Sequence, residues 1–262
     1  MGAIHWGTAA VLSVAAWLPV RAAAAQTGFN GVITFTNYSH SGQASTFVQT
    51  TKGRKVRLDG MGGEQGAMIV DGDAKVVTMV QPEKKQYITM TDEDMKQAQA
   101  MMAPMMERSK GMNQHPDAGK YSFSNTGRTE TVAGVPCQVW HGVYTDQGKK
   151  EEGEACVASG VGFALAELTF ANPMAHKGGA GYEQFEQYRQ LVGGNKGILK
   201  ITKIEDGKPV PQMVATKIER TPVSDDAFKP PAGYTEVRMG DMMKQAQGAM
   251  KQMQQKMKDS GQ

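Results

Sequence analysis

The stretch that decides the fold runs from Thr126 to Ser159 and reads TGRTETVAGVPCQVWHGVYTDQGKKEEGEACVAS. It contains both cysteines of the chain, Cys137 and Cys156. A turn signal, Asp-Gln-Gly at 146–148, lies between two flanks rich in β-forming residues. Folding the chain about that turn sets Cys137 opposite Cys156. The stretch therefore predicts a β-hairpin that a disulfide clamps, with two free buried thiols as the alternative.

The N-terminus has the features of a secretory signal peptide. Residues 9–20 form an apolar run, and the four alanines at 22–25 offer small residues for cleavage. The run is too short for a stable membrane span. The preceding region contains His5 but no lysine or arginine, which leaves the true start codon open. We expect residues 1–25 to be cleaved near Ala25 and the mature chain to be periplasmic; the alternative is a buried N-terminal helix.

Composition narrows the function classes. The chain has 262 residues, which suits one large domain or two small ones, and a net charge of +3 with both signs interspersed. We therefore expect no nucleic-acid partner, because such partners call for a strongly basic face. No cysteine follows the predicted cleavage site, so we do not expect a lipid anchor.

Short alternating segments dominate the first third of the mature chain. They predict an antiparallel meander with one buried and one solvated face, because alternate side chains of a strand point to opposite sides. The predicted strands are 31–38, 44–50, 55–59, 66–70, 75–80 and 86–90.

A methionine-rich helix is predicted next, within residues 91–112. Thr91 is a good N-cap, and three acidic residues follow it, which suits the positive end of a helix. Met95, Ala98, Met102 and Met105 then recur at helical spacing. Beyond the disulfide hairpin we expect helices at 162–171 and 182–192, a hairpin of 197–204 with 210–220, and a closing Pro-Gly-Tyr segment at 230–234.

The end of the chain, residues 240–262, is a Met/Gln/Lys-rich tail. Its apolar residues follow a narrow heptad stripe, namely Met243, Ala246, Met250, Met253 and Met257. The tail could dock on the domain, pair with its copy through residues 241–258, lie on a membrane surface, or stay solvated.

Several short motifs occur in an order that is similar to a known family. They are Gly31-Val-Ile-Thr-Phe35, Lys52-Gly-Arg-Lys-Val-Arg-Leu-Asp59, Met68-Ile-Val-Asp71, Lys85-Gln-Tyr87, Thr126-Gly127 with Ala133-Gly-Val-Pro-Cys137, and Asp225-Asp-Ala-Phe-Lys-Pro-Pro-Ala-Gly-Tyr234. The chain resembles an uncharacterised periplasmic family of unknown function whose fold is similar to that of the LolA/LolB lipoprotein carriers. The resemblance implies an α+β fold over residues 26–239: an antiparallel, unclosed half β-barrel with helices covering its concave face.

By analogy with the carriers, the resemblance implies a non-enzymatic protein that binds a lipid or a lipoprotein acyl chain. Methionine side chains are flexible and polarizable, so a Met-lined helix could re-pack around an acyl chain. The candidate ligand-binding residues are Met95, Met102, Met105 and Met106. The alternative is that these methionines belong to an ordinary core.

No catalytic motif or cofactor signature accompanies this pattern. The serines stand in no nucleophile-elbow sequence, and the glycine clusters lack the GK[ST] of a phosphate-binding loop. A metal site is one alternative function, since thioether sulfur suits Cu(I). Its ligands would be Met101, Met102, Met105, Met106, Met112 and His115. Another alternative is an envelope adaptor that uses the C-terminal helix.

Overall fold

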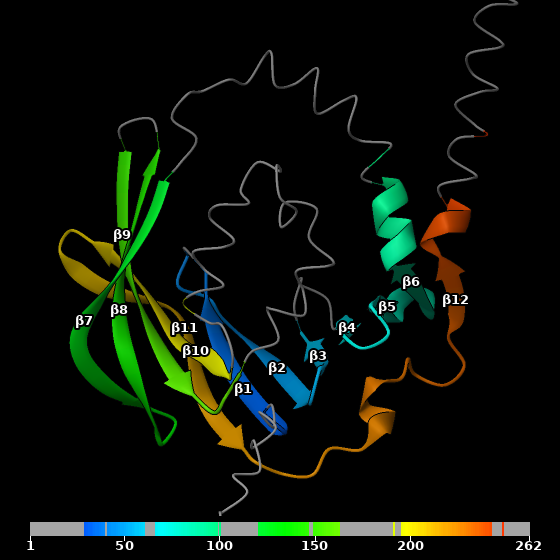
Figure 1. Cartoon of the computed structure of the whole chain (residues 1–262), viewed down its shortest axis with the longest axis horizontal. Coiled ribbons are helices and arrows are strands. Elements are labelled where there is room, and N and C mark those ends of the chain that lie inside the picture. The colour runs from blue at the N-terminus through cyan, green and yellow to red at the C-terminus, as the bar shows by residue number, and fades with distance from the viewer. Residues whose placement is uncertain are drawn as a thin grey trace, which may run out of the picture.

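A single sheet organises the computed structural model of the chain (Figure 1). The structure describes residues 29–39, 41–60, 66–98, 100, 120–146, 149–162, 191, 195–242 and 248. The strands are β1 (Gly31–Tyr38), β2 (Ala44–Lys52), β3 (Lys55–Asp59), β4 (Ala67–Asp71), β5 (Val76–Gln81), β6 (Gln86–Thr91), β7 (Lys120–Val132), β8 (Val135–Asp146), β9 (Lys149–Ser159), β10 (Lys196–Glu205), β11 (Lys208–Glu219) and β12 (Thr235–Arg238). Within the described residues, two 3-10 helices lie between strands, η1 (Pro82–Lys84) and η4 (Asp225–Phe228).

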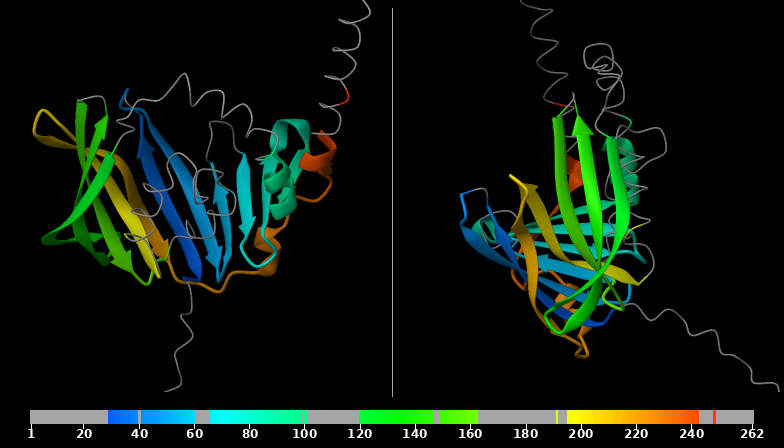
Figure 2. Two further views of the ribbon diagram at one scale, coloured as in Figure 1. Left: turned by 45° about the horizontal axis from the view of Figure 1, so that its top comes forward. Right: turned by 90° about the vertical axis from the view of Figure 1, so that its left-hand side faces the viewer.

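The strand order is β12-β6-β5-β4-β3-β2-β1-β11-β10-β9-β8-β7, so β12 and β7 are the two edges within the described part of the chain. Figures 1 and 2 show that the sheet bends into an open trough whose edges rise on either side. This large unclosed sheet agrees with the expected half-barrel at the level of its architecture. The sheet is mostly antiparallel, as expected, and it departs from the expectation at one edge, where β12 runs parallel to β6.

The predicted meander is confirmed. The bounds of β1 and β3 agree with the prediction, and β2, β4, β5 and β6 differ from it by one or two residues. Alternation explains this success, since Ile33 and Phe35 are buried while their neighbours in β1 are half-buried. In the turn between β4 and β5, Asp71 Oδ1 accepts hydrogen bonds from the backbone N–H groups of Asp73 and Ala74.

The disulfide hairpin is confirmed, but its predicted register was wrong. Cys137 and Cys156 are bonded, with their Cα atoms 5.3 Å apart, and each is 2% exposed. The residue directly opposite Cys156 is Val139, because the strands turn after Asp146, which pairs with Lys149. The loop is thus one residue nearer the C-terminus than predicted, and the two cysteines are diagonal neighbours.

Two strands were missing from the sequence prediction. β7 contributes 13 residues beside β8, joined to it by a tight turn in which Ala133 and Gly134 have φ values of 47° and 80°. Its residues are mostly polar, so the segment does not show the alternation that marks a strand. β12 has only four residues. It follows a segment rich in proline and glycine, a composition that predicts the end of the fold rather than another strand.

The described part of the predicted methionine-rich helix is its start. Residues 92–98 are helical, and Thr91 and Asp94 cap them reciprocally. The Asp94 N–H donates to Thr91 Oγ1 at 3.1 Å, and the Thr91 N–H donates to Asp94 Oδ2 at 2.9 Å. A second helical segment, 239–242, lies beside this one: a Cβ added to Gly240 would be 2.7 Å from Asp94 Oδ1.

Candidate functional site

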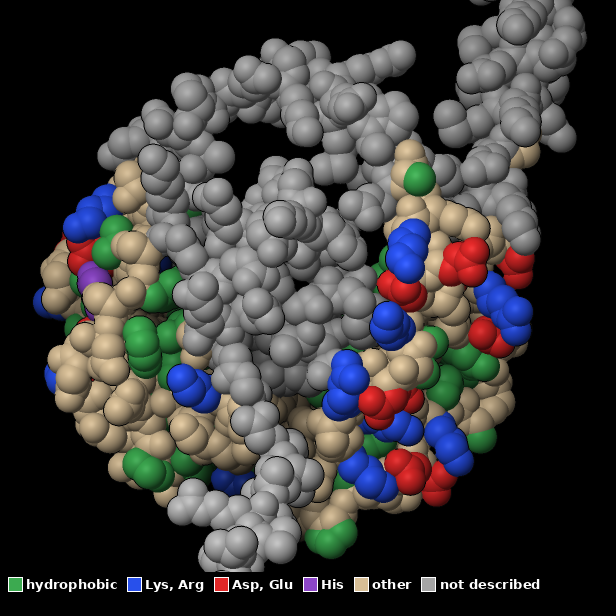
Figure 3. Space-filling model, in the orientation of Figure 1, with side chains coloured by type: hydrophobic (Ala, Val, Ile, Leu, Met, Phe, Trp, Pro, Cys, Tyr) green, Lys and Arg blue, Asp and Glu red, His purple; other side chains and the backbone are tan. Residues whose placement is uncertain are grey.

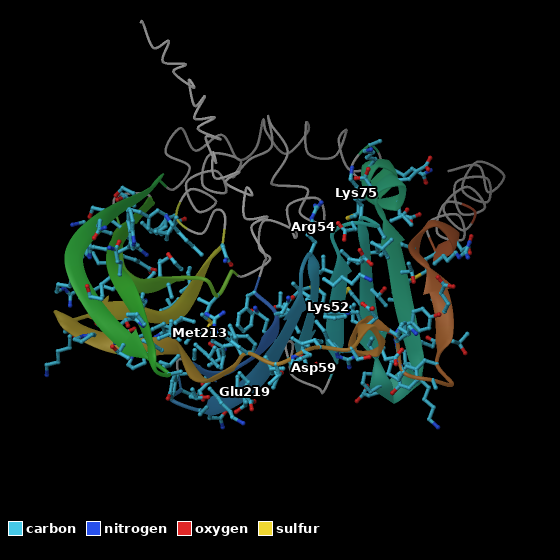
Figure 4. All side chains as sticks on the ribbon, turned by 60° about the horizontal axis from the view of Figure 1, so that its bottom comes forward. Lys52, Arg54, Asp59, Lys75, Met213 and Glu219 are labelled. Carbon is cyan, nitrogen blue, oxygen red and sulfur yellow. A yellow bond between two sulfur atoms is a disulfide. The ribbon has the colours of Figure 1, made fainter. Side chains whose placement is uncertain are left out.

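One face of the sheet is crossed by residues 221–234, which we call the strap (Figures 1 and 4). The strap connects β11 to β12 on the outside of the trough. Its Phe228 and Tyr234 pack on a cluster in the strands beneath, formed by Ala67, Ile69, Val80 and Tyr87. These residues therefore define the outer face of β4 to β6.

Charged side chains of the β2–β3 hairpin fasten the strap. Arg57 Nη1 donates to the backbone oxygen of Ala227 at 3.2 Å, while its Nε donates to Asp59 at 2.8 Å. Lys52 forms an ion pair of 3.1 Å with Asp225 of the strap. Figure 3 shows charged groups of both signs gathered over this part of the molecule. The motifs at 52–59 and 225–234 therefore meet in space, and their contacts hold the strap on the outer face.

The opposite, inner face carries a row of side chains that runs directly across the strands. Because Ile69 and Arg57 point outward, their neighbours Met68 and Leu58 point into the trough. The ladder pairings extend this row from β1 to β12, and we call it the inner row. Its members are Ile33, Gln49, Leu58, Met68, Met79, Ile88 and Val237.

Burial changes along the inner row. Ile33 and Leu58 are each 1% exposed and Gln49 is 0% exposed, whereas Met79 on β5 is 44% exposed. Four apolar side chains near Met79 are only partly buried, whereas Val70 and Val77 on the same face of β4 and β5 are 0% and 2% exposed. Together with Met79 these four form what we call the inner patch: Met68, Ile88, Met90 and Val237. The inner face is thus closed at its centre and only partly covered over β4, β5, β6 and β12, where Met79 is the most exposed member of the inner row.

The inner face continues beyond β1 with further apolar residues. Met213 of β11 lies opposite Asn37, which is on the same side of β1 as Ile33. Met213, which is labelled in Figure 4, pairs with Ile201 of β10. Ile201 pairs with Ala155 of β9, and Ala155 pairs with Trp140 of β8. Leu191, 4% exposed, packs against this group. Both arms of the trough therefore present apolar side chains to its interior.

Residues 29–234 match the family described as a domain of unknown function, DUF4412. The match covers well over half of the 262 residues. The chain belongs to the DUF4412 family. A comparison with curated proteins finds no match. The match includes β1 to β11 and the strap, and it stops immediately before β12.

A polar pair interrupts the apolar inner face of this DUF4412 protein. Gln49 and Thr51 are adjacent on the inner side of β2, and Gln49 Nε2 donates to Thr51 Oγ1 at 3.1 Å. They are 0% and 1% exposed. Among the described residues, Gln49 Oε1 is the buried side-chain polar atom that has no hydrogen-bond partner. The pair faces Leu58 and Val56 on one side and Ile33 and Gly31 on the other.

The predicted site residues fall mostly outside the described part of the chain. Met95 is described and is half-buried on the helix of residues 92–98. The other candidates for ligand or copper binding lie outside the described residues: Met101, Met102, Met105, Met106, Met112 and His115. The predicted helices at 162–171 and 182–192, apart from Gly162 and Leu191, and the tail beyond Met242, apart from Gly248, also lie outside.

Two further observations concern the described residues. No helix there is both long and apolar enough to cross a membrane. No group of three or more His, Cys, Asp or Glu side chains in these ranges is arranged to hold a metal ion. His141 has an acidic neighbour, with its Nε2 3.5 Å from Glu152 Oε2. The hydrogen bond and charge of Lys150, followed by the charge of His141, lower the pKa of that Glu152 carboxyl.

The methionines of the inner patch were missed as site candidates, although a signal for them exists in the sequence. Turns centred on 72–75 and 82–85 set the register of β4, β5 and β6, and that register places Met68, Met79 and Ile88 side by side. The sequence prediction considered methionines only in the predicted helix, in the cluster at 101–112 and in the C-terminal tail.

Proposed function

We propose that this DUF4412 protein is an exported, non-enzymatic carrier or binder of an apolar ligand, a lipid or a lipoprotein acyl chain. The ligand lies in the trough of a half-barrel similar to that of the LolA/LolB carriers. The observation that carries this proposal is the inner patch, because it leaves apolar side chains partly exposed on a concave surface. Contiguous exposed apolar surface of this kind marks binding sites more often than isolated exposed residues do.

The chemistry of the inner patch favours an acyl chain over a polar ligand. Its five members are all apolar, and three of them are methionines, whose flexible thioethers adapt to irregular chains. Each methylene of a ligand that leaves water for such a surface contributes about 0.8 kcal/mol. A concave sheet increases that contribution, because it touches a chain on more than one side.

The charged groups of the neighbouring strands support the same interpretation. Lys55 pairs with Asp71 at 3.5 Å and Arg57 with Asp59 at 2.8 Å, and Arg57 lies on the outer face together with the strap. None of the inner-row residues is charged. An anionic headgroup would therefore stay near the rim, while the hydrocarbon part would occupy the row.

A fatty-acid binding assay tests the proposal. The full chain would be expressed with its N-terminus intact and recovered from the periplasmic fraction, which also tests export. After delipidation, binding of an environment-sensitive fluorescent fatty acid would be titrated. Met79→Lys should weaken binding at least about tenfold, because a lysine charge in the patch must be desolvated when the chain binds.

The control is Met242→Lys. Met242 is 43% exposed, almost the same as Met79, but it lies on the C-terminal helical segment rather than in the trough. This variant should bind the probe like the wild type. The proposal fails if the wild type takes up no probe, or if the two substitutions weaken binding equally.

A further inference from the structure

An open pocket lies at one end of β5, between the turn that joins β4 to β5 and the helix of residues 92–98. Its volume is about 670 Å³, and residues of both segments line it. The backbone oxygen of Lys75 accepts a hydrogen bond from the Asp92 N–H at 3.2 Å, so these residues extend the β5–β6 ladder to the pocket (Figure 4). Met90 of the inner patch is two residues before Asp92, or about 7 Å along the strand. The pocket therefore adjoins the inner patch.

Four charged side chains of the described residues line the pocket, and two of them are already paired. Lys96 Nζ lies 2.7 Å from Asp92 Oδ2, so these two charges compensate each other. The other two side chains are Lys75 and Glu93. Both are exposed, and neither forms a hydrogen bond or an ion pair within the described part of the chain. This pocket therefore offers a ligand one unpaired cation and one unpaired anion from those residues.

We propose that the pocket binds a zwitterionic headgroup, in which a phosphate is linked to an ammonium, of a lipid whose acyl chain lies on the inner patch. This inference rests on the proposed function and names its ligand class, a phospholipid with an ethanolamine headgroup. The Lys75 ammonium binds the phosphate as a point charge. The Glu93 carboxylate accepts a hydrogen bond from the headgroup ammonium.

The charges of the pocket favour a zwitterion over a headgroup of a single sign. A headgroup with only a phosphate would place negative charge beside Glu93, and one with only an ammonium would place positive charge beside Lys75. A headgroup that carries both signs matches these two side chains at once. Because both side chains are exposed, water and salt screen each contact, and the preference that it produces is small.

The spacing of the pocket and the inner patch fits a single lipid molecule. Met79 is four residues from Lys75 along β5, or about 13 Å. An acyl chain whose headgroup lies at Lys75 therefore passes Met90 and reaches Met79. Val77 between them is 2% exposed, so the chain contacts the flanking methionines rather than this valine. The chain does not have to enter the closed centre of the inner face, where Leu58 is 1% exposed.

Two lysophospholipids with the same acyl chain test the inference, one with a zwitterionic ethanolamine headgroup and one with an anionic glycerol headgroup. Dissociation constants would be measured on the delipidated full chain, below the concentration at which the lipids form micelles. The wild type should bind the ethanolamine lipid about two- to fivefold more tightly, the range expected for an exposed charge pair. Glu93→Gln should bind the two lipids equally. Lys75→Gln should weaken binding of both about two- to fivefold, because both carry the phosphate.

Matched control substitutions exist in η1, at the opposite end of β5. Glu83 and Lys84 are exposed, like Glu93 and Lys75, and neither lines the pocket. Glu83→Gln and Lys84→Gln make the same changes of net charge, so both should bind the two lipids as the wild type does. Glycerophosphoethanolamine, the headgroup without an acyl chain, should not compete with either lipid, because burial of the hydrocarbon supplies most of the binding free energy.

The outcomes separate the two proposals. The headgroup inference is overturned, while the proposed function stands, if the wild type binds the fluorescent fatty acid but does not prefer the ethanolamine lipid. The same conclusion follows if Glu93→Gln keeps the preference, or if the η1 variants change binding as much as the pocket variants do. Strong competition by glycerophosphoethanolamine would also overturn the inference, because the pocket would then bind a free headgroup rather than a lipid. If the wild type binds neither the lysophospholipids nor the fatty acid, the proposed function fails, and the inference fails with it.

Discussion

Opening the Cys137–Cys156 bond should destabilise the protein by an amount that the loop length predicts. The bond joins residues 19 positions apart, and closing a loop of that size lowers the entropy of the unfolded chain. The corresponding stabilisation is about 3 kcal/mol. For a chain of this size each kcal/mol shifts the melting temperature by about 2–4 °C, so reduction should lower it by roughly 6–12 °C.

Equilibrium unfolding in urea, with and without a phosphine reductant, measures this effect. Trp140 is a convenient reporter because it lies in β8 beside the bond, and the other two tryptophans, Trp6 and Trp17, fall in the predicted signal peptide. Both sulfurs are buried in the folded state, so the samples must be unfolded and refolded in reductant. The slope of the unfolding transition should also increase, since a reduced chain exposes more surface when it unfolds.

The matched control is the double variant Cys137→Ala/Cys156→Ala. It should be at least as unstable as the reduced wild type, because it also loses buried sulfur atoms, and reductant should not change it further. An unchanged urea midpoint for the reduced wild type would refute the reasoning, as it would mean that the bond does not restrict the unfolded chain.

Two other substitutions test how the sheet is held together. Gly31→Ala should destabilise the protein by at least about 3 kcal/mol in urea unfolding. Gly31 has a φ of 152°, and a Cβ at this position would lie 2.0 Å from the Glu219 backbone oxygen, so the substitution breaks the β1–β11 pairing. Gly134→Ala, whose Cβ meets nothing within 4 Å, should lose only about 1–2 kcal/mol from its left-handed φ; equal losses would contradict this account. Arg57→Ala should release the strap, with a loss of about 2 kcal/mol and faster amide exchange in residues 221–234. Lys217→Ala, which removes an exposed ion pair with Glu219, should change neither by much, and similar exchange in both variants would count against the strap contacts.

The parts of the fold that the sequence predicted are those in which local pattern and packing agree. β1 and β3 alternate cleanly, and the Thr91–Asp94 cap is a local motif that needs no tertiary context. The register of the disulfide hairpin depended on the placement of a two-residue loop, and an error of one residue there moved the partner of Cys156 by two. β7 and β12 owe their strand conformation to the neighbours they pair with, which no window of sequence contains.

The candidate site was harder to predict for a related reason. A helical stripe is visible within one segment, so Met95 and the methionines after it were easy to single out. The inner row is built from one residue on each of several strands, and it exists only after every register is known. Gln49 is the extreme case, because its sequence neighbours give no sign that both adjacent strands place apolar residues against it.

The way in which the outer face of β4 and β5 is covered explains how the inner patch is supported. Ile69 and Val80 on the outer face are 3% and 6% exposed, and Val70 and Val77 on the inner face are 0% and 2% exposed. These strands are thus apolar on both sides and need cover on both. On the outer side the strap supplies this cover through Phe228 and Tyr234. The hydrogen bond from Arg57 to the strap holds the strands in place from that outer side. A surface supported in this way is ordered before a ligand arrives, so binding to the inner patch does not have to supply the free energy of ordering it. Under the proposed function, the strap would therefore raise ligand affinity without touching the ligand.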